Sequence, residues 1–403
     1  MSDNHVPNYM SIKYWFLLLA LIGLSACGGG GATTPAATRS FVMGFTPFPY
    51  DYSTDPATLS QIVDDVYTKL GKSADLVTHH FDNGIPWTDA LADTYPYNAH
   101  IMSDWQLRRD KTPAGFKKYI AITPINLDRN GLALLRDSAD DMALPLPFST
   151  YAANGDFNAS DIKTAYLNYC KRVIAYFSPD YLAIGIETNL LRKNTDATTW
   201  AKYVELNHYV YAELKKLYPA LPIFVSVSPV EAIPGYVGPT AEFSSAADPA
   251  AAYAASQLSA LSDVLSDSDD YAISLYPFMT VYYNSALPSD MLDKLFGLSD
   301  KPLVIAETGM LAKDLTINSG ALTLTGSETR QNDYVSQLLL KADAAHAQFI
   351  NWFILQDYDA LCNALVGCSD TQSLWRNTGL YDSAGNPRMS YTTWMQWLAR
   401  PLR

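Results

Sequence analysis

The feature that most constrains this chain is a regular alternation of short apolar runs and longer helical patterns, which begins at Phe41. Short apolar runs bounded by Pro and Gly are typical of buried parallel strands, and each is followed here by a segment with helical periodicity. Eight strand–helix pairs in strict alternation predict an α/β protein with a single (β/α)8 barrel and extended loops at the C-terminal face. The expected strands are residues 41–48, 74–80, 118–124, 181–186, 222–227, 271–276, 303–306 and 349–355.

An open, doubly wound sheet is the alternative arrangement of alternating strands and helices. That fold usually carries a Gly-rich turn after its first strand, where backbone N–H groups bind a phosphate. Here the first strand ends in Thr46-Pro-Phe-Pro49, and proline has no N–H to donate. The barrel is therefore the preferred prediction, and residues 41–403 are expected to form one domain.

The N-terminal segment does not follow this alternation. An apolar run at residues 16–22, preceded by Lys13, is too short to span a bilayer comfortably and is typical of a signal peptide. It leads into Leu-Ser-Ala-Cys27, which resembles the bacterial lipoprotein box. We expect residues 1–26 to be a lipoprotein signal peptide, Cys27 to be lipidated and residues 27–40 to be a flexible tether. An ordinary signal peptide with an incidental cysteine is the alternative. Lipidation would anchor the protein in the bacterial cell envelope, at the outer membrane or cell surface, without spanning the membrane.

Composition restricts the class of partner. The chain has 403 residues, of which 48% are hydrophobic, which is ample for a large core. Its net charge is −13, whereas a protein that binds nucleic acid needs a basic surface. We therefore expect no nucleic-acid partner. The acidic balance is compatible with a neutral substrate, although it is also common on surfaces of no special function. We also expect the protein to be a monomer.

The spacing of cysteines and histidines does not favour a metal or cofactor site. Cys362 and Cys368 lie six positions apart in a polar loop and can form a disulfide, whereas Cys170 falls within a helical pattern. His79 and His80 are adjacent at a strand end, but no cluster of Cys and His has the spacing of metal ligands. We expect no metal and no organic cofactor.

Two of the apolar runs end in a glutamate. Ile-Gly-Ile-Glu187 ends the fourth expected strand, and Val-Ile-Ala-Glu307 ends the seventh. Because the carboxyl ends of parallel strands share one end of a barrel, both side chains are expected at its mouth. A buried carboxylate is costly without a partner or a role. The pair is therefore a candidate catalytic site, and capping of helices at the barrel end is the structural alternative.

Further polar and aromatic residues lie at or just after the expected strand ends. Paired carboxylates suit glycoside hydrolysis, in which one protonates the leaving oxygen and the other attacks the anomeric carbon. Aromatic rings supply flat apolar faces for sugar rings, and Trp375 is a further candidate for this role. The candidate substrate-binding residues are His79, His80, Asp82, Asn83, Trp87, Asn126, Asn189, Tyr276, Trp352, Gln356 and Asp357.

Four short stretches resemble the large clan of retaining glycoside hydrolases with (β/α)8 barrels, and most of all the arabinogalactan endo-β-1,4-galactanases. They are Ile184-Gly-Ile-Glu-Thr-Asn189, Ile273-Ser-Leu-Tyr-Pro-Phe278, Val304-Ile-Ala-Glu-Thr-Gly309 and Asn351-Trp-Phe353. The resemblance implies that Glu187 is the acid/base and Glu307 the nucleophile. It also implies that Tyr276 hydrogen-bonds Glu307, that Trp352 lies under the sugar at the cleavage site, and that the substrate is a β-linked poly- or oligosaccharide.

The chain departs from the clan's pattern at two places. The clan usually has Asn immediately before the acid/base, where it holds the sugar 2-hydroxyl, and this chain has Ile186. The clan also usually places an Arg near the nucleophile from strand two, where this chain reads Thr78-His-His-Phe-Asp82. We expect His79 or His80 to take that contact. The departures leave open a carbohydrate-binding lipoprotein without turnover, built on a hydrolase-like barrel.

Overall fold

The computed structural model describes residues 37–317, 320–364 and 367–403, so the expected signal peptide and Cys27 lie outside the described residues. Nine strands form one sheet in the order β5-β4-β3-β2-β1-β11-β8-β7-β6, with parallel pairing throughout. Only Val225 separates β5 from β6 along the chain, so the two ends of this order meet and the sheet closes into the predicted barrel. The strands are β1 (Val42–Thr46), β2 (Leu76–Phe81), β3 (Lys117–Ile122), β4 (Tyr181–Ala183), β5 (Ile223–Phe224), β6 (Ser226–Val227), β7 (Tyr271–Leu275), β8 (Leu303–Thr308) and β11 (Phe349–Ile354).

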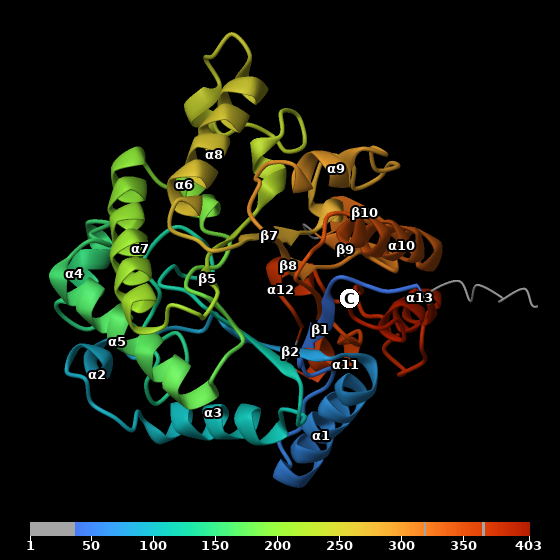
Figure 1. Cartoon of the computed structure of the whole chain (residues 1–403), viewed down its shortest axis with the longest axis horizontal. Coiled ribbons are helices and arrows are strands. Elements are labelled where there is room, and N and C mark those ends of the chain that lie inside the picture. Colours follow the sequence, from blue (N-terminus) through green and yellow to red (C-terminus); the bar gives the residue numbers. More distant parts are fainter. Residues whose placement is uncertain (1–36, 318–319, 365–366) are drawn as a thin grey trace, which may run out of the picture. The chain divides into compact units, whose positions relative to one another are not determined.

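Helices surround the barrel (Figure 1). In the part of the chain that the structure describes, no helix combines the length and the apolar character needed to cross a membrane. The α-helices are α1 (Pro56–Ser73), α2 (Trp87–Leu91), α3 (Ala99–Lys111), α4 (Phe148–Ala153), α5 (Ser160–Phe177), α6 (Asn189–Asn194), α7 (Ala197–Leu217), α8 (Pro249–Leu265), α9 (Met291–Phe296), α10 (Glu328–Ala344), α11 (Asp359–Ala364), α12 (Asp370–Ser373) and α13 (Met389–Leu398). The 3-10 helices are η1 (Pro229–Ala232), η2 (Ala241–Phe243) and η3 (Pro277–Met279).

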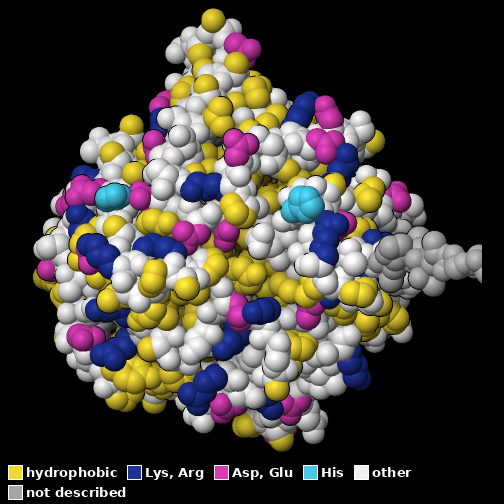
Figure 2. All heavy atoms as spheres, viewed as in Figure 1, with side chains coloured by type: hydrophobic (Ala, Val, Ile, Leu, Met, Phe, Trp, Pro, Cys, Tyr) yellow, Lys and Arg dark blue, Asp and Glu magenta, His cyan; other side chains and the backbone are white. Residues whose placement is uncertain are grey.

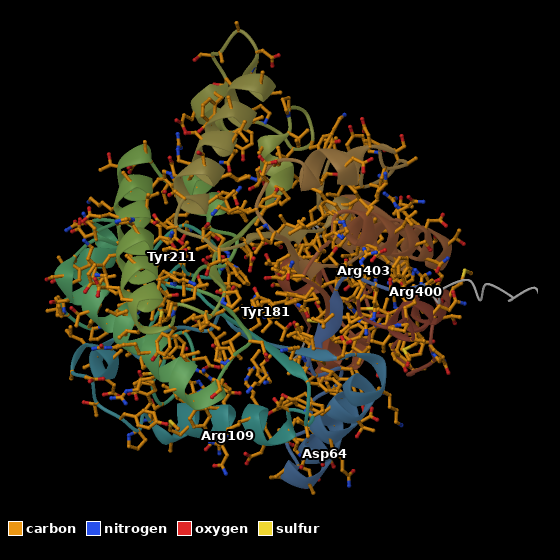
Figure 3. All side chains as sticks on the ribbon, viewed as in Figure 1. Asp64, Arg109, Tyr181, Tyr211, Arg400 and Arg403 are labelled. Atoms are coloured by element: carbon orange, nitrogen blue, oxygen red, sulfur yellow. A yellow bond between two sulfur atoms is a disulfide. The ribbon has the colours of Figure 1, made fainter. Side chains whose placement is uncertain are left out.

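Side chains fill the barrel interior towards the N-terminal ends of the strands. Because successive residues of a strand point to opposite faces, every second residue packs inside and the others pack under the helices. The ring of Phe349 lies 4.8 Å from the rings of Tyr119 and Tyr181, centroid to centroid. Tyr181 is the first residue of β4 and is labelled near the centre of the view in Figure 3. This aromatic packing closes one end of the barrel, so a site must lie at the C-terminal ends of the strands.

Two elements differ from the sequence prediction. β8 is followed by an antiparallel hairpin, β9 (Lys313–Ile317) and β10 (Leu322–Ser327), which the prediction lacks. Its strands are mostly exposed and bury a single leucine each, so they carry little of the hydrophobic pattern of a core strand. The segment between β3 and α5 contains the short helix α4. On the face shown in Figure 2, acidic and basic side chains are interspersed.

Candidate active site

A cavity of 230 Å³ lies at the C-terminal ends of the strands and contains both predicted glutamates. Acidic and basic groups line one part of it, and aromatic and aliphatic side chains line the rest. No group of three or more His, Cys, Asp or Glu side chains among the described residues is arranged to hold a metal ion. The lining residues are Phe48, His80, Asp82, Arg129, Glu187, Glu307, Phe353, Ile354, Tyr358, Leu361, Cys368, Gln372 and Trp375.

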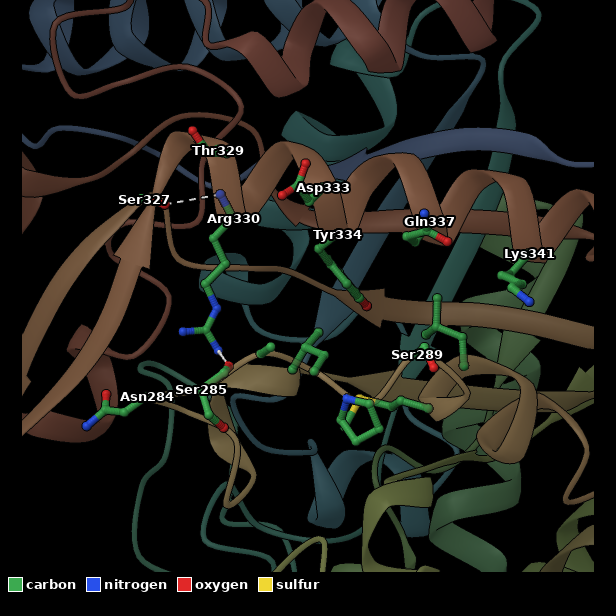
Figure 4. A pocket seen from close by; sticks show the side chains of 15 residues that line it. Asn284, Ser285, Ser289, Ser327, Thr329, Arg330, Asp333, Tyr334, Gln337 and Lys341 are labelled. Atoms are coloured by element: carbon green, nitrogen blue, oxygen red, sulfur yellow. Dashed lines mark hydrogen bonds between the residues drawn. The ribbon is translucent and has the colours of Figure 1, made fainter.

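A larger cavity of 630 Å³ lies away from the strand ends, between α10 and the segment of residues 284–292 (Figure 4). Its two basic side chains are already engaged. Arg330 donates to the backbone carbonyls of Tyr282 (2.7 Å) and Ser285 (2.9 Å), and Lys341 pairs with Asp293 (2.7 Å). This cavity has no pair of carboxylates, so the smaller cavity is the candidate for catalysis.

Glu307 lies on β8 and is 4% exposed. Its Oε2 accepts a hydrogen bond from the hydroxyl of Tyr276 (3.0 Å), and its Oε1 lies 3.0 Å from Nε2 of His80. Burial by itself would raise the pKa of Glu307, but the charge and hydrogen bond of His80, the charge of Arg129 and the hydrogen bond from Tyr276 lower it below its ordinary value. Glu307 is therefore held as a carboxylate.

Glu187 follows β4 and has a backbone φ of +49°, a conformation that is costly for a residue with a side chain and is often found at functional sites. Its N–H donates to Oγ of Ser226 (3.0 Å), and its Oε1 accepts from Oγ of Ser274 (2.7 Å). Burial, followed by the negative charge of Glu307, raises the pKa of Glu187 above its ordinary value, against the opposing charge of Arg129. The pKa values of the two carboxyl groups in this cavity are therefore shifted in opposite directions, upward for Glu187 and downward for Glu307.

Arg129 is a part of the site that the sequence analysis missed. It lies in the loop after β3, is 6% exposed and has a φ of +53°. Its guanidinium makes two hydrogen bonds to the carboxylate of Asp82, at 3.1 and 2.6 Å, and its Nη2 lies 3.4 Å from Oε2 of Glu187. Arg129 therefore supplies a positive charge beside Glu187, from the same loop as Asn126, the residue that the sequence analysis chose there instead.

The adjacent histidines of β2 point to opposite faces. His80 faces the cavity and contacts Glu307, and the charge and hydrogen bond of that carboxylate raise the pKa of His80 although burial would lower it. His79 is fully buried, hydrogen-bonds Thr112 (2.9 Å) and packs on Phe177. Burial, followed by the charge of Arg108, lowers the pKa of His79 to about 3 and keeps the ring neutral. The expectation that His79 belongs to the site is therefore wrong.

The prediction that Trp352 lies under the sugar in the site is also wrong. It is 0% exposed, packs on Tyr334 of α10 and donates from Nε1 to the carbonyl of Thr378 (2.9 Å), so it faces the helix layer. The next residue, Phe353, lines the cavity instead, and its ring contacts that of Trp375 edge to face at a centroid distance of 5.8 Å. Trp375 is in the cavity, as the sequence allowed.

Three predicted site residues belong to the loops and helices around the cavity and do not line it. Trp87 is buried, stacks on Phe148 and donates from Nε1 to the carbonyl of Ala133 (2.8 Å). The side chain of Asn126 hydrogen-bonds that of Asn130 within its own loop, at 2.8 Å. The backbone carbonyl of Asn83 accepts from the N–H of Asp141 at 3.3 Å, where two loops meet. None of these contacts is with a group that lines the cavity, so the structure does not bring these three residues into the candidate site.

Three others are buried in structural hydrogen bonds, so their assignment to the site is also wrong. Asn189 bridges the backbone of Ser228, with its Nδ2 donating (3.0 Å) and its Oδ1 accepting (2.7 Å). Gln356 accepts from Nζ of Lys69 at 2.6 Å. Both oxygens of Asp357 bind the guanidinium of Arg388, at 2.9 and 2.7 Å.

Replacing Asp357 by alanine is expected to lower the free energy of unfolding by about 3–5 kcal/mol, because it removes both charged hydrogen bonds of the buried Arg388 to Asp357 and leaves, as its ion pair, only a 3.6 Å contact with the exposed Glu328. The side chains of Asp357 and Arg388 are 0% and 5% exposed. Urea unfolding followed by circular dichroism measures this change, with the exposed Asp128→Ala as the matched control. A loss below 1 kcal/mol for Asp357→Ala would contradict the structural role.

The chain was compared with known proteins. A scan against models of protein families and a search of curated protein sequences gave no significant match. The fold is similar to that of the exo-β-1,4-mannosidase Op5Man5 from Opitutaceae bacterium strain TAV5, with a TM-score of 0.57, 12% identity and coverage of 90% of this chain and 59% of that one. It is also similar to a GH5_18 protein from Streptomyces cattleya in complex with Manβ1-4GlcNAc, with a TM-score of 0.56, 11% identity and coverage of 91% and 83%.

A fungal β-1,4-galactanase gives a TM-score of 0.49 at 15% identity, with coverage of 83% of this chain and 91% of the galactanase. The mannosidase and the Streptomyces protein superpose better, and at their low identity the similarity concerns the fold. The chain therefore has an α/β barrel fold similar to that of the mannosidase and the Streptomyces protein.

Proposed function

We propose that the protein is a retaining glycoside hydrolase that acts on a β-linked poly- or oligosaccharide, with Glu307 as nucleophile and Glu187 as acid/base. The observation that carries the proposal is the pair of carboxyl groups in one cavity, the half-buried Glu187 with a raised pKa and the buried Glu307 with a lowered one. Such a pair provides a protonated acid and an ionised nucleophile at the same pH.

In the first step the carboxylate of Glu307 attacks the anomeric carbon while Glu187 transfers its proton to the glycosidic oxygen. The bond from carbon to that oxygen breaks, and a glycosyl ester of Glu307 forms. The hydrogen bonds from Tyr276 and His80 hold the two oxygens of Glu307 and keep the group ionised until it attacks.

In the second step a water molecule attacks the anomeric carbon, its proton passes to Glu187, and the ester bond to Glu307 breaks. Esterification removes the negative charge of Glu307, which is the second-largest cause of the raised pKa of Glu187. Arg129 remains beside Glu187, so the pKa of Glu187 falls once the ester has formed, and Glu187 is then suited to act as a base.

The proposal predicts a bell-shaped dependence of kcat/KM on pH. Activity is lost as pH falls through the lowered pKa of Glu307, because the nucleophile is protonated, and as pH rises through the raised pKa of Glu187, because the acid is ionised. His80→Gln keeps a hydrogen-bond donor but removes the charge that counts most in lowering the pKa of Glu307. The acidic limb of the profile should therefore move to higher pH.

The measurement is the pH profile of kcat/KM for the wild type, His80→Gln and the control His100→Gln. His100 pairs with Asp140 on the surface, outside the cavity, so its replacement should leave both limbs in place. An acidic limb that is the same in His80→Gln and in the wild type would contradict the assigned role of His80.

The second candidate function is carbohydrate binding without turnover. Ile186 favours it, because this residue is 0% exposed in the apolar core and offers no hydrogen bond to a sugar hydroxyl. The test is release of reducing sugar from β-linked galactan, mannan and glucan by the wild type. Release from one of them supports the hydrolase and identifies its substrate, whereas calorimetric binding without release supports the binding protein.

We further propose that Cys27 is lipidated and anchors the protein in the bacterial cell envelope, as the Leu-Ser-Ala-Cys27 sequence suggests. Replacing Cys27 by alanine should abolish incorporation of radiolabelled palmitate in cells and move the protein out of the membrane fraction. Labelled protein from Cys27→Ala cells would contradict this proposal.

A further inference from the structure

One side of the candidate active site is closed by a wall that follows β11. We call it the β11-side wall; it consists of Phe353, Tyr358, Leu361, Cys368 and Trp375, which all line the cavity. These side chains are apolar or aromatic, and the ring of Trp375 packs edge to face on those of Phe353 and Tyr276 at centroid distances of 5.8 and 5.7 Å. The wall therefore borders directly on the tyrosine that binds Glu307.

Several independent contacts fix the β11-side wall in place. Two of them lie within residues 358–372, one joins this segment to the loop after β1, and one joins it to the β9–β10 hairpin. The contacts are the Cys362–Cys368 disulfide, the hydrogen bond from the hydroxyl of Tyr358 to the carbonyl of Gln372 (2.5 Å), the bond from the N–H of Leu361 to the carbonyl of Tyr50 (3.2 Å) and the Lys313–Asp359 ion pair (2.8 Å).

The wall lies on the side of the cavity away from the proposed acid. When β5 and β6 are counted as one strand, β4 and β11 are diametrically opposed in the ring. Glu187 follows β4, and the leaving oxygen of a substrate must lie beside Glu187 to receive its proton. The leaving part of the substrate therefore extends towards β4, and the non-reducing end of the cleaved sugar faces the β11-side wall.

The size of the cavity limits what fits between the wall and Glu187. Its volume of 230 Å³ is below the range of about 300–1,000 Å³ that is typical of sites for drug-sized ligands. This space suits one sugar ring and not a chain of several. A polysaccharide that continued past the cleaved sugar at its non-reducing end would meet the β11-side wall.

We infer that the site is a blind pocket that accepts the terminal sugar at the non-reducing end of a β-linked chain, so that the protein releases monosaccharides one at a time. This inference deepens the proposed function and rests on it. It identifies Trp375, at the border between the β11-side wall and the proposed nucleophile, as a residue that determines this specificity.

The test uses β-1,4-linked manno-, gluco- and galactohexaoses that carry a fluorescent label at the reducing end. At low conversion, the expected labelled product is the pentaose alone, together with an equal amount of free monosaccharide. Labelled di- and trioses appearing from the start would show internal cleavage and overturn the inference while leaving the hydrolase intact. No cleavage of any hexaose would overturn the proposed function and this inference with it.

A substrate with a blocked end tests the wall itself. A 4,6-O-benzylidene group on the non-reducing sugar should reduce hydrolysis by the wild type more than 100-fold, because the pocket has no room for it. In Trp375→Ala the ratio of blocked to unblocked hydrolysis should rise at least 10-fold, whereas the control Thr371→Ala, on α12 but outside the cavity, should keep the wild-type ratio. Equal hydrolysis of the two substrates by the wild type would overturn the blind pocket.

Discussion

Replacing Glu307 by glutamine is expected to reduce kcat by about 10⁴-fold or more, as the loss of a catalytic nucleophile does in other enzymes. Glutamine has nearly the same shape and still accepts a hydrogen bond from Tyr276, but it cannot attack the anomeric carbon. Because the geometry is kept, substrate binding measured by calorimetry should remain within a few-fold of the wild type. The assay is release of reducing sugar from the substrate that the panel identifies.

The matched control is Glu242→Gln. Glu242 is an exposed acid that pairs with Arg192 at 2.8 Å on the surface, outside the cavity. Its replacement should leave kcat unchanged. If Glu307→Gln kept a tenth or more of the wild-type activity, Glu307 would not be the nucleophile. If Glu307→Gln lost both binding and thermal stability, the loss of activity would reflect unfolding.

Replacing Glu187 by alanine is expected to reduce hydrolysis of natural substrates by about 10²–10⁴-fold, the usual contribution of a general acid–base group. The loss should be much smaller for the first step on a 2,4-dinitrophenyl glycoside, because this leaving group departs without a proton. The glycosyl ester of Glu307 should then accumulate, since no base remains to activate water. Mass spectrometry of the intact protein measures this ester.

Azide provides the diagnostic readout for the same variant. It is a nucleophile that needs no general base, and the alanine leaves room for it beside Arg129, whose charge favours an anion. Azide should accelerate turnover of the dinitrophenyl glycoside by Glu187→Ala and yield the β-glycosyl azide, with no effect on the wild type. An azide-insensitive variant, or an α-glycosyl azide as product, would contradict the assignment of Glu187.

The sequence was sufficient to predict the barrel and the position of two glutamates at its mouth, because both depend on local patterns. An apolar run that stops at a carboxylate defines a strand and its C-terminal end, and the closed sheet then brings Glu187 and Glu307 into one cavity. The contact between Tyr276 and Glu307, which the resemblance to the hydrolase clan implied, forms because β7 and β8 are neighbours in the sheet.

The sequence could not decide which face of a fully buried strand a residue occupies. β11 has the sequence Phe-Ile-Asn-Trp-Phe-Ile, and because every residue except Asn351 is apolar, the strand lacks a clear alternation that would separate inner from outer residues. Its pairing with β8 also shifts register between Ile350 and Trp352. Because successive side chains of a strand point to opposite faces, Phe353, four residues after the inward-facing Phe349, lines the cavity, and Trp352 faces the helix layer.

Residues outside the strands were harder to predict for a different reason. A polar side chain near a strand end can bind a substrate or satisfy a buried backbone group, and the sequence looks alike in both cases. The side chain of Asn189 satisfies buried backbone groups of Ser228. Arg129 and Glu187 are 58 positions apart in the sequence, and Arg129 also pairs with Asp82, 47 positions away. No local pattern encodes contacts between residues so far apart.

The central claim is that Glu187 and Glu307 cleave a β-glycoside by double displacement, and the configuration of the first-formed product tests it most directly. Proton NMR distinguishes the two anomers of the released sugar, provided that spectra are recorded within minutes, before mutarotation mixes them. The account predicts that the β-anomer appears first and that the α-anomer follows only by mutarotation. The α-anomer as first product would show single displacement by water and would contradict a nucleophilic role for Glu307.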